Sequence, residues 1–343
     1  MSTLAAPSLS TAPAERHRSP TRMALRRFLR NYLAIAGLLV LVALFAACFG
    51  ALPWSLSPAP AASPAREQVI PRYEFHTPNL KAPPTPQLWM GTNALGQDLR
   101  PRFFFGGAIS LSLGIASALI AILIGTSVGL LAGYVGGRTD ATLMRIVDIL
   151  YGLPYILLVM IMRVSLVPYF AYVIAGTGFN LQRLHLLSAS LPDSTISQWS
   201  NFLVLLVGIG SVSWLTLARV VRGQVLSLRD QPFIEAARAL GFPARRIIAR
   251  HILPNILGTI IVYGTLTVPA AVLSESFLSF LGLGIQPPIP SWGNLASEGM
   301  EALNPVRVQW WMITWPCAGL SLALLALNFV GDGIREAFDP RSQ

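Results

Sequence analysis

Residues that commonly carry catalysis or bind metals are scarce and dispersed in this sequence. The four histidines, His17, His76, His185 and His251, lie far apart, and no Cys/His spacing matches a zinc site. No pair of carboxylates has a spacing typical of acid–base catalysis. The glycine-rich stretch at 133–138 lacks the Lys-Ser or Lys-Thr ending of a phosphate-binding loop, so we expect a tight turn there. The sequence therefore predicts no catalytic, metal or nucleotide-binding site in this chain.

A polar stretch at 231–255 lies between two apolar runs and has the pattern of two short helices. It reads QPFIEAARALGFPARRIIARHILPN. Pro232 suits a first helical turn, and Gly241 can end that helix in a left-handed conformation. Pro243 can then open a second helix that carries Ile247, Ile248 and Ile252. A simple connector between two membrane spans would not need these features.

One face of the first helix has the properties of a docking surface. Four small or apolar residues recur there at helical spacing, namely Phe233, Ala236, Ala237 and Leu240. The two alanines would let a partner's backbone approach closely, and Glu235 and Arg238 would place charge beside that contact. The alternative is a solvated amphipathic loop that packs only on its own protein.

The composition indicates a membrane protein. Hydrophobic residues make up 53% of the 343 residues and charged residues 12%, and the mean hydropathy is +0.58. A soluble domain has about 25% charged residues. Six apolar runs have about the length that a spanning helix needs, at 33–52, 107–134, 142–162, 202–220, 256–273 and 308–330. We therefore expect an all-α integral membrane protein with six transmembrane helices.

The net charge of +10 follows from arginines that flank the apolar runs. They cluster at 16–30 and 219–250, as the positive-inside rule predicts, so the charge does not indicate a nucleic-acid partner. This distribution places both termini and the 231–255 loop in the cytoplasm. Cys48 and Cys317 both fall inside predicted spans, where cysteine packs as a small apolar residue.

Four residues near the opposite side are candidates for gating or for a structural role. Gly91 permits a tight turn, and Asp98 can cap a short helix along the membrane interface that the aromatic residues at 103–105 would anchor. Trp292 suits an aromatic belt. Glu275 lies near the outer end of a span, where it has either a functional role or access to water.

The third predicted span has two further features. Arg145 and Asp148 are three residues apart, so we expect them to pair on one helix face. Pro154 should kink this span, either to line a path or only for packing. The following stretch at 163–200 is of mixed polarity, and we expect it to be an insertion on the outer face.

From about residue 88 to residue 341 the chain resembles the C-type permease subunits of dipeptide, oligopeptide and nickel ABC importers. The motifs are GTNALGQDL, WLTLARVVRGQVLSL, EAARALG with RHILPN, ESFLSFLGLGIQPPIPSWG and FVGDGIREAFDPR. Asn93, Gln97 and His251 depart from the usual pattern, as does the insertion. The 231–255 loop is similar to the EAA loop of this family, and the resemblance assigns ATPase coupling to Glu235, Ala236, Ala237, Arg238, Gly241, Leu253 and Pro254.

The resemblance implies a type I importer permease of the MetI-like fold in the bacterial inner membrane. Such a subunit would pair with a B-type permease, two ATPases would bind ATP and Mg and dock on the loop, and an external binding protein would deliver peptides. This subunit itself would hold no cofactor and catalyse no reaction. The alternatives are a nickel- or opine-type importer permease, or a membrane-embedded enzyme or receptor with an adaptor-docking loop.

The expected domain organisation follows from the spans and the resemblance. It consists of a cytoplasmic tail at 1–30, an anchor helix at 31–54, a periplasmic segment at 55–100, a permease core at 101–335 and a cytoplasmic tail at 336–343. The core would include the outer insertion at 163–200 and the cytoplasmic coupling loop at 223–255.

Overall fold

The computed structural model describes residues 25–59, 70–183, 193–303 and 308–338, and these residues are mainly helical. After a first helical turn at 25–28, the elements are α2 (Tyr32–Gly50), α3 (Leu52–Leu56), α4 (Leu99–Val135), α5 (Gly137–Gly152), α6 (Tyr155–Arg183), α7 (Asp193–Arg229), α8 (Pro232–Ala239), α9 (Ala244–Ile247), the π-helix η1 (Ile248–Ile252), α10 (Leu253–Phe280), α11 (Trp292–Glu301) and α12 (Trp310–Phe338). Within the described part, β-structure is limited to three isolated bridges between positions 58 and 98. The expected all-α class is confirmed.

Six helices within the described residues are long and apolar enough to cross a membrane. They are Tyr32–Leu56, Leu99–Val135, Tyr155–Thr177, Ile196–Arg229, Ala244–Phe280 and Trp310–Phe338. The expected number of spans is therefore confirmed. Five of them contain the predicted apolar runs almost entirely, but the third does not coincide with its prediction.

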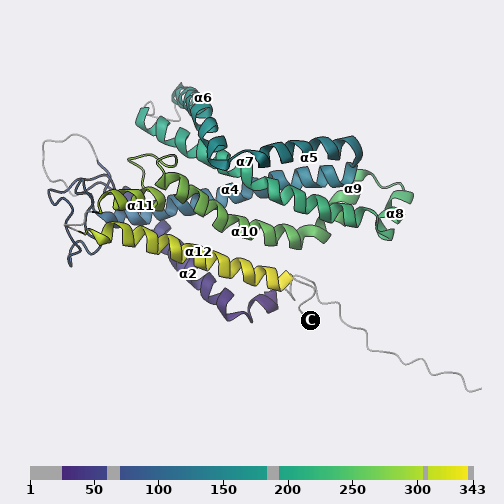
Figure 1. The fold of residues 1–343 in the computed structure, drawn as a ribbon, viewed down its shortest axis with the longest axis horizontal. Coiled ribbons are helices and arrows are strands. Elements are labelled where there is room, and N and C mark those ends of the chain that lie inside the picture. Colours follow the sequence, from purple (N-terminus) through teal and green to yellow (C-terminus); the bar gives the residue numbers. More distant parts are fainter. Residues whose placement is uncertain (1–24, 60–69, 184–192, 304–307, 339–343) are drawn as a thin grey trace, which may run out of the picture.

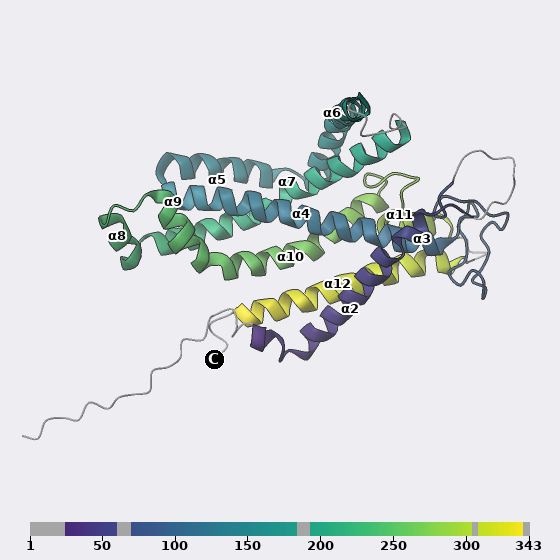
Figure 2. The same ribbon diagram turned by 180° about the vertical axis from the view of Figure 1, so that it is seen from behind.

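The predicted span at 142–162 is not one helix. It is divided at Leu153 and Pro154 between α5 and α6, because Leu153 has extended backbone and the chain cannot continue helically into the proline. The break is sharper than the expected kink, and α6 turns away from the direction of α4, α5 and α7 (Figures 1 and 2).

The expected outer insertion at 163–200 begins in the wrong place. Arg163 lies inside α6, which continues to Arg183, and α7 already begins at Asp193. Residues 184–192 lie outside the described part of the chain. Apolar side chains continue helically beyond Met162, so this part of the stretch belongs to a spanning helix.

A stripe of glycines brings α4 and α7 together along their length. A Cβ atom added at Gly129 would lie 2.7 Å from the carbonyl oxygen of Ala218, and one at Gly133 would lie 2.7 Å from the Cβ of Val225. Gly125 makes the same kind of approach one turn earlier. Small residues at a four-residue spacing allow helix backbones to pack closely in a membrane. These glycines therefore fix the centre of the bundle.

The long helices run between two ends that differ in structure (Figure 1). At one end, which we call the α8 end, lie α8 and α9, and the start of α2 and the end of α12 point toward this end but stop short of it. At the other, the α11 end, α11 packs near the irregular segment before α4. A buried cluster lies toward each end: Ile247, Ile252 and Val221 belong to one, and Trp292 and Trp311 to the other.

Candidate functional site

The loop at the α8 end folds as the sequence predicted, into a short helix, a glycine bend and a second helical start. Pro232 lies in the first turn of α8. Gly241 has a φ of +75°, its N–H donates to the Arg238 carbonyl at 2.9 Å, and the Phe242 N–H donates to the Ala237 carbonyl at 3.2 Å. This pair of hydrogen bonds is a Schellman motif. The left-handed cap expected at Gly241 is confirmed.

The helix α8 has one buried and one exposed side, and they differ from the predicted face. Ile234 is fully buried and Ala237 is 4% exposed, because both pack against Ile247 and α7. Phe233 is 44% exposed and Leu240 73% exposed. The exposed side of α8 therefore consists of Phe233, Glu235, Ala236, Arg238 and Leu240. The expectation that Ala237 belongs to it is wrong, since Ala237 anchors the loop to its own protein.

The second part of the loop is continuous with a transmembrane helix. We expected a separate short helix, but α9 passes through the π-turn η1 directly into α10. The Leu253 N–H donates to the Ile248 carbonyl five residues earlier, and Pro254 follows in the first turn of α10. A π-turn adds one residue to the helix, so the Leu-Pro pair is accommodated without a break. The three segments α9, η1 and α10 therefore follow one another without a connecting loop.

Aromatic rings and arginines surround the bend. The Arg246 guanidinium lies 4.5 Å from the centroid of the Phe242 ring, and the His251 ring is stacked on the same ring at 6.4 Å. The guanidinium of Arg238 lies 5.5 Å from the centroid of Tyr134 at the end of α4. Cation–π contacts of this kind stabilise by roughly 0.5–1 kcal/mol at exposed sites. His251, which departs from the family pattern, therefore has a packing role here.

Two ion pairs join α5 to α7 near this end, and neither pair was predicted from the sequence. Asp148 accepts a hydrogen bond from Arg219 Nη2 at 2.8 Å, so the expected pairing with Arg145 is wrong. Asp140 accepts from Arg222 Nη2 at 2.6 Å and also from its Nε. The hydrogen bonds from Arg222 hold the pKa of the Asp140 carboxyl below its usual value. Only the helix arrangement brings these partners together.

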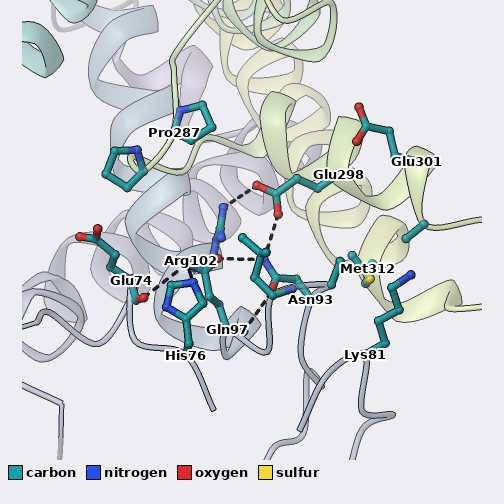
Figure 3. Close-up of a pocket in the computed structure, with 14 residues that line it drawn as sticks. Glu74, His76, Lys81, Asn93, Gln97, Arg102, Pro287, Glu298, Glu301 and Met312 are labelled. Atoms are coloured by element: carbon teal, nitrogen blue, oxygen red, sulfur yellow. Dashed lines mark hydrogen bonds and ion pairs between the residues drawn. The ribbon is translucent and has the colours of Figure 1, made fainter. Parts of the chain in front are cut away.

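A polar hollow of about 730 Å³ lies at the α11 end (Figure 3). Its wall includes Arg102, whose side chain is 4% exposed and whose Nη2 donates to Glu298 Oε1 at 2.6 Å. Asn93 donates from Nδ2 to Glu298 Oε2 at 3.2 Å and to Gln97 Oε1 at 2.9 Å. Asn93 and Gln97, two of the residues that depart from the family pattern, thus bond to each other.

Two of the predicted residues at this end, Gly91 and Trp292, are buried within the fold, and a third, Asp98, is half-buried. Gly91 makes the expected turn with a φ of +76°, and a Cβ there would lie 2.7 Å from the Ala82 carbonyl oxygen. Asp98 caps the 37-residue helix α4, so the expected short interfacial helix is absent. Trp292 is fully buried and its Nε1 donates to the Phe103 carbonyl at 3.1 Å, so its expected place in an aromatic belt is wrong.

Glu275 is fully buried, and the expectation that water might reach it is wrong. Its carboxylate accepts from Ser279 Oγ at 2.7 Å and from Ser276 Oγ at 3.3 Å. The hydroxyls of Ser110 of α4 and of Ser291, the N-cap of α11, also lie close to it. A buried carboxylate needs such partners, and this one links three elements. Whether Glu275 also acts in transport stays a prediction.

Within the described residues, no group of three His, Cys, Asp or Glu side chains could hold a metal ion.

The sequence did not predict the roles of Ile234, the Asp140–Arg222 pair and the Arg102–Glu298 pair. The spacing of Ile234 to Ala237 was an available indication of the buried side of α8, since three residues place both on one face. The two ion pairs join residues 82 and 196 positions apart, so no local pattern indicates them.

Comparisons with known proteins agree over nearly the whole chain. Residues 125–343 match the family described as "Binding-protein-dependent transport system inner membrane component", and residues 19–84 match the "N-terminal TM domain of oligopeptide transport permease C". The dipeptide transport system permease protein DppC of Bacillus subtilis is 39% identical over 324 residues, which are 94% of this chain and 86% of that protein.

Other relatives match the chain to a similar extent. The oligopeptide transport system permease proteins OppC of Haemophilus influenzae and Escherichia coli are 39% and 38% identical, and the matches cover 95% of this chain and 90% and 93% of theirs. A solved structure of the MetNI methionine ABC transporter in an inward-facing conformation has a TM-score of 0.47 and 22% identity. It covers 68% of this chain and 94% of its own.

Proposed function

The chain belongs to the family of binding-protein-dependent transport system inner membrane components, and from this premise we propose that it is the C-type permease subunit of an ATP-driven peptide importer. The relatives named as dipeptide and oligopeptide permeases support the substrate class. They match this chain across its spans, its loop and its N-terminal region. The subunit translocates peptides across the bacterial inner membrane by alternating access, together with a B-type permease and an external binding protein.

The observation that carries the coupling role is the exposed side of α8. Phe233, Ala236 and Leu240 face outward from a helix that Ile234 and Ala237 fix to the bundle. The exposed apolar side of an anchored helix is suited to bind in a groove of a partner protein. We assign that groove to an ATPase subunit. ATP and Mg bind to the two ATPase subunits, which dock on this loop and on the equivalent loop of the other permease.

The loop's connections explain how ATP-driven closure moves the spans. Force on α8 passes through the buried contact of Ile234 and Ala237 to α7, and force on α9 passes through η1 into α10. Packed helices shift as rigid bodies and change between discrete arrangements. Closure of the ATPases therefore tilts α7 and α10 together and alternates access to the translocation path.

The experiment that tests coupling substitutes Ala236, which is exposed and small. Ala236→Arg places a long charged side chain on the docking face without entering the core, and Ala236→Ser is the matched control at the same position. We expect Ala236→Arg to abolish both uptake and substrate-stimulated ATP hydrolysis in reconstituted vesicles, and Ala236→Ser to keep both. Wild-type uptake by Ala236→Arg would remove the basis of this assignment.

We also propose that both termini and the α8 end face the cytoplasm. The start of α2 and the end of α12 both point toward the end of the molecule that carries the α8–α9 loop (Figure 1), and the arginine clusters of the sequence flank these segments. In a background without Cys48 and Cys317, a cysteine at Arg245 should react only with reagents added from the cytoplasmic side. A cysteine at Leu95 should react only from the other side, and labelling of both from one side contradicts the orientation.

A further inference from the structure

An apolar groove of about 350 Å³ lies toward the α8 end, where the two termini of the described chain meet. Leu25 and Phe28 of the first helical turn and Leu38 of α2 line it from the N-terminal part of the chain. Val330, Ile334 and Phe338 of α12 line it from the C-terminal part. Its lining side chains are all apolar, so water gains almost no hydrogen bond there.

Hydrogen bonds and close packing hold the first helical turn and α2 against α12 beside this groove. Asn31 caps α2 by accepting from the Ala34 N–H at 3.1 Å, and its Nδ2 donates to Glu336 Oε2 of α12 at 2.7 Å. A Cβ added at Gly333 would lie 2.3 Å from the Ala34 Cβ and 3.2 Å from the Phe28 ring. These contacts fix the first turn beside α12, and they leave the groove between them.

The groove crosses the level at which a lipid headgroup meets its acyl chain. The apolar run of α2 begins at residue 33, and that of α12 ends at residue 330, because charged residues follow at 332, 335 and 336. Leu25 and Phe28 precede the first run, Val330 ends the last one, and Leu38 lies about one and a half turns inside the first. At 1.5 Å per residue the groove therefore reaches roughly 8 Å into the hydrocarbon layer. An elongated apolar groove at this depth matches an acyl chain that lies along the helices.

The headgroup end of the groove is bordered by cations. Arg26 and Arg30 are exposed on the segment that carries Phe28, and exposed Arg335 follows Ile334 on α12. The nearby acids of α12 are Glu336, which Asn31 engages, and exposed Asp332. The positive-inside rule explains arginines anywhere in this segment, but it does not explain an apolar groove between them.

We propose that this groove binds one anionic phospholipid. Its acyl chain lies along Leu38 and Val330, and its headgroup phosphate lies between Arg335 and the arginines Arg26 and Arg30. A neutral phospholipid fills the same groove without preference, because it lacks the net negative charge that these arginines attract. The proposal concerns the lipid requirement of the chain, and it does not rest on the proposed transport function.

A photoactivatable phosphatidylglycerol, with the reactive group in its acyl chain, tests the proposal. The probe is incorporated in nanodiscs that contain the purified importer complex, and labelled peptides are identified by mass spectrometry. We expect labels on the peptides that contain Leu38 and Val330. Excess phosphatidylglycerol should displace them, whereas excess phosphatidylcholine or inorganic phosphate should not.

Two sets of variants separate a binding site from a general charge effect. The double variant Arg26→Gln with Arg30→Gln should lower labelling roughly thirtyfold. Each arginine near an anionic headgroup strengthens binding about fivefold, and the variant removes two of them. The control, Arg138→Gln with Arg145→Gln, removes two exposed arginines from α5 and should leave labelling unchanged. Leu38→Trp should block the groove without changing charge. Equal displacement by phosphatidylcholine, equal loss in the control, or no label in the groove would each overturn the proposal.

Discussion

Replacing Gly241 with alanine changes the coupling loop at the point where its two helical parts change direction. Gly241 has a φ of +75°, and a Cβ added there meets no heavy atom within 4 Å. The variant therefore creates no clash, and its whole effect arises from the backbone conformation. A left-handed conformation costs an ordinary residue about 1–2 kcal/mol.

This cost is large relative to the free energies that hold a loop in one shape. Every 1.4 kcal/mol changes an equilibrium constant tenfold, so the bent conformation becomes roughly five- to thirtyfold less favoured. The buried contacts of Ile234, Ala237 and Ile247 resist unbending. If these contacts keep the bend, the conformational free energy appears as a lower thermal stability of the protein. If the contacts break, α8 loses its orientation on the ATPase.

The assay measures peptide uptake, substrate-stimulated ATP hydrolysis and thermal stability on the same reconstituted complex. Gly241→Ala should lower uptake and stimulated hydrolysis together, because one element couples them. Gly241→Asn is the matched control, since asparagine tolerates the left-handed region better than alanine does. It should lie close to wild type. If Gly241→Ala equals wild type in all three measurements, the bend is not a constrained coupling element and the reasoning is refuted.

Three further predictions concern the bundle. Gly129→Leu drives α4 and α7 apart and should destabilise the protein by about 1–3 kcal/mol or more. The measurement is the melting temperature in detergent, and a value equal to that of wild type would contradict the close packing of α4 on α7. Glu298→Ala leaves the buried Arg102 charge without its partner and should destabilise the protein by about 3–5 kcal/mol. Adding Arg102→Met should recover most of this loss, and no recovery would argue against the ion-pair explanation. Arg222 lowers the pKa of the Asp140 carboxyl in the folded protein. The pair therefore stabilises the fold at pH values above the ordinary pKa of this carboxyl, and the contribution is lost as the pH falls through the lowered pKa. The melting temperatures of wild type and Asp140→Asn should therefore differ at neutral pH and converge in acid, and a difference that is the same at every pH opposes this.

The loop at 231–255 shows how much local sequence determines. Pro232, Gly241 and Pro243 each act on their own backbone, through a fixed φ or a freely accessible positive φ. Their effects do not depend on distant residues, so the end of α8 and the bend were predictable. The same holds for five of the six apolar spans, whose length and hydropathy alone require a lipid environment.

The side chains that face the partner were not predictable in the same way. Ala236 and Ala237 are chemically identical neighbours, and only the position of α7 and Ile247 decides that Ala237 is buried and Ala236 exposed. Likewise, Asp148 has arginines within reach on its own helix and on α7, and the crossing of α5 over α7 selects Arg219.

The membrane location, the helical class and the bent two-helix loop follow from local sequence, because apolar length, proline and glycine act within a few residues. The burial of Trp292, the serine hydroxyls around Glu275 and the groove between α2 and α12 arise only from the packing of the helices. Each of these depends on residues that are distant in the chain and meet only after the helices have packed. Packing is a property of complementary surfaces, and a single segment carries only one side of each contact.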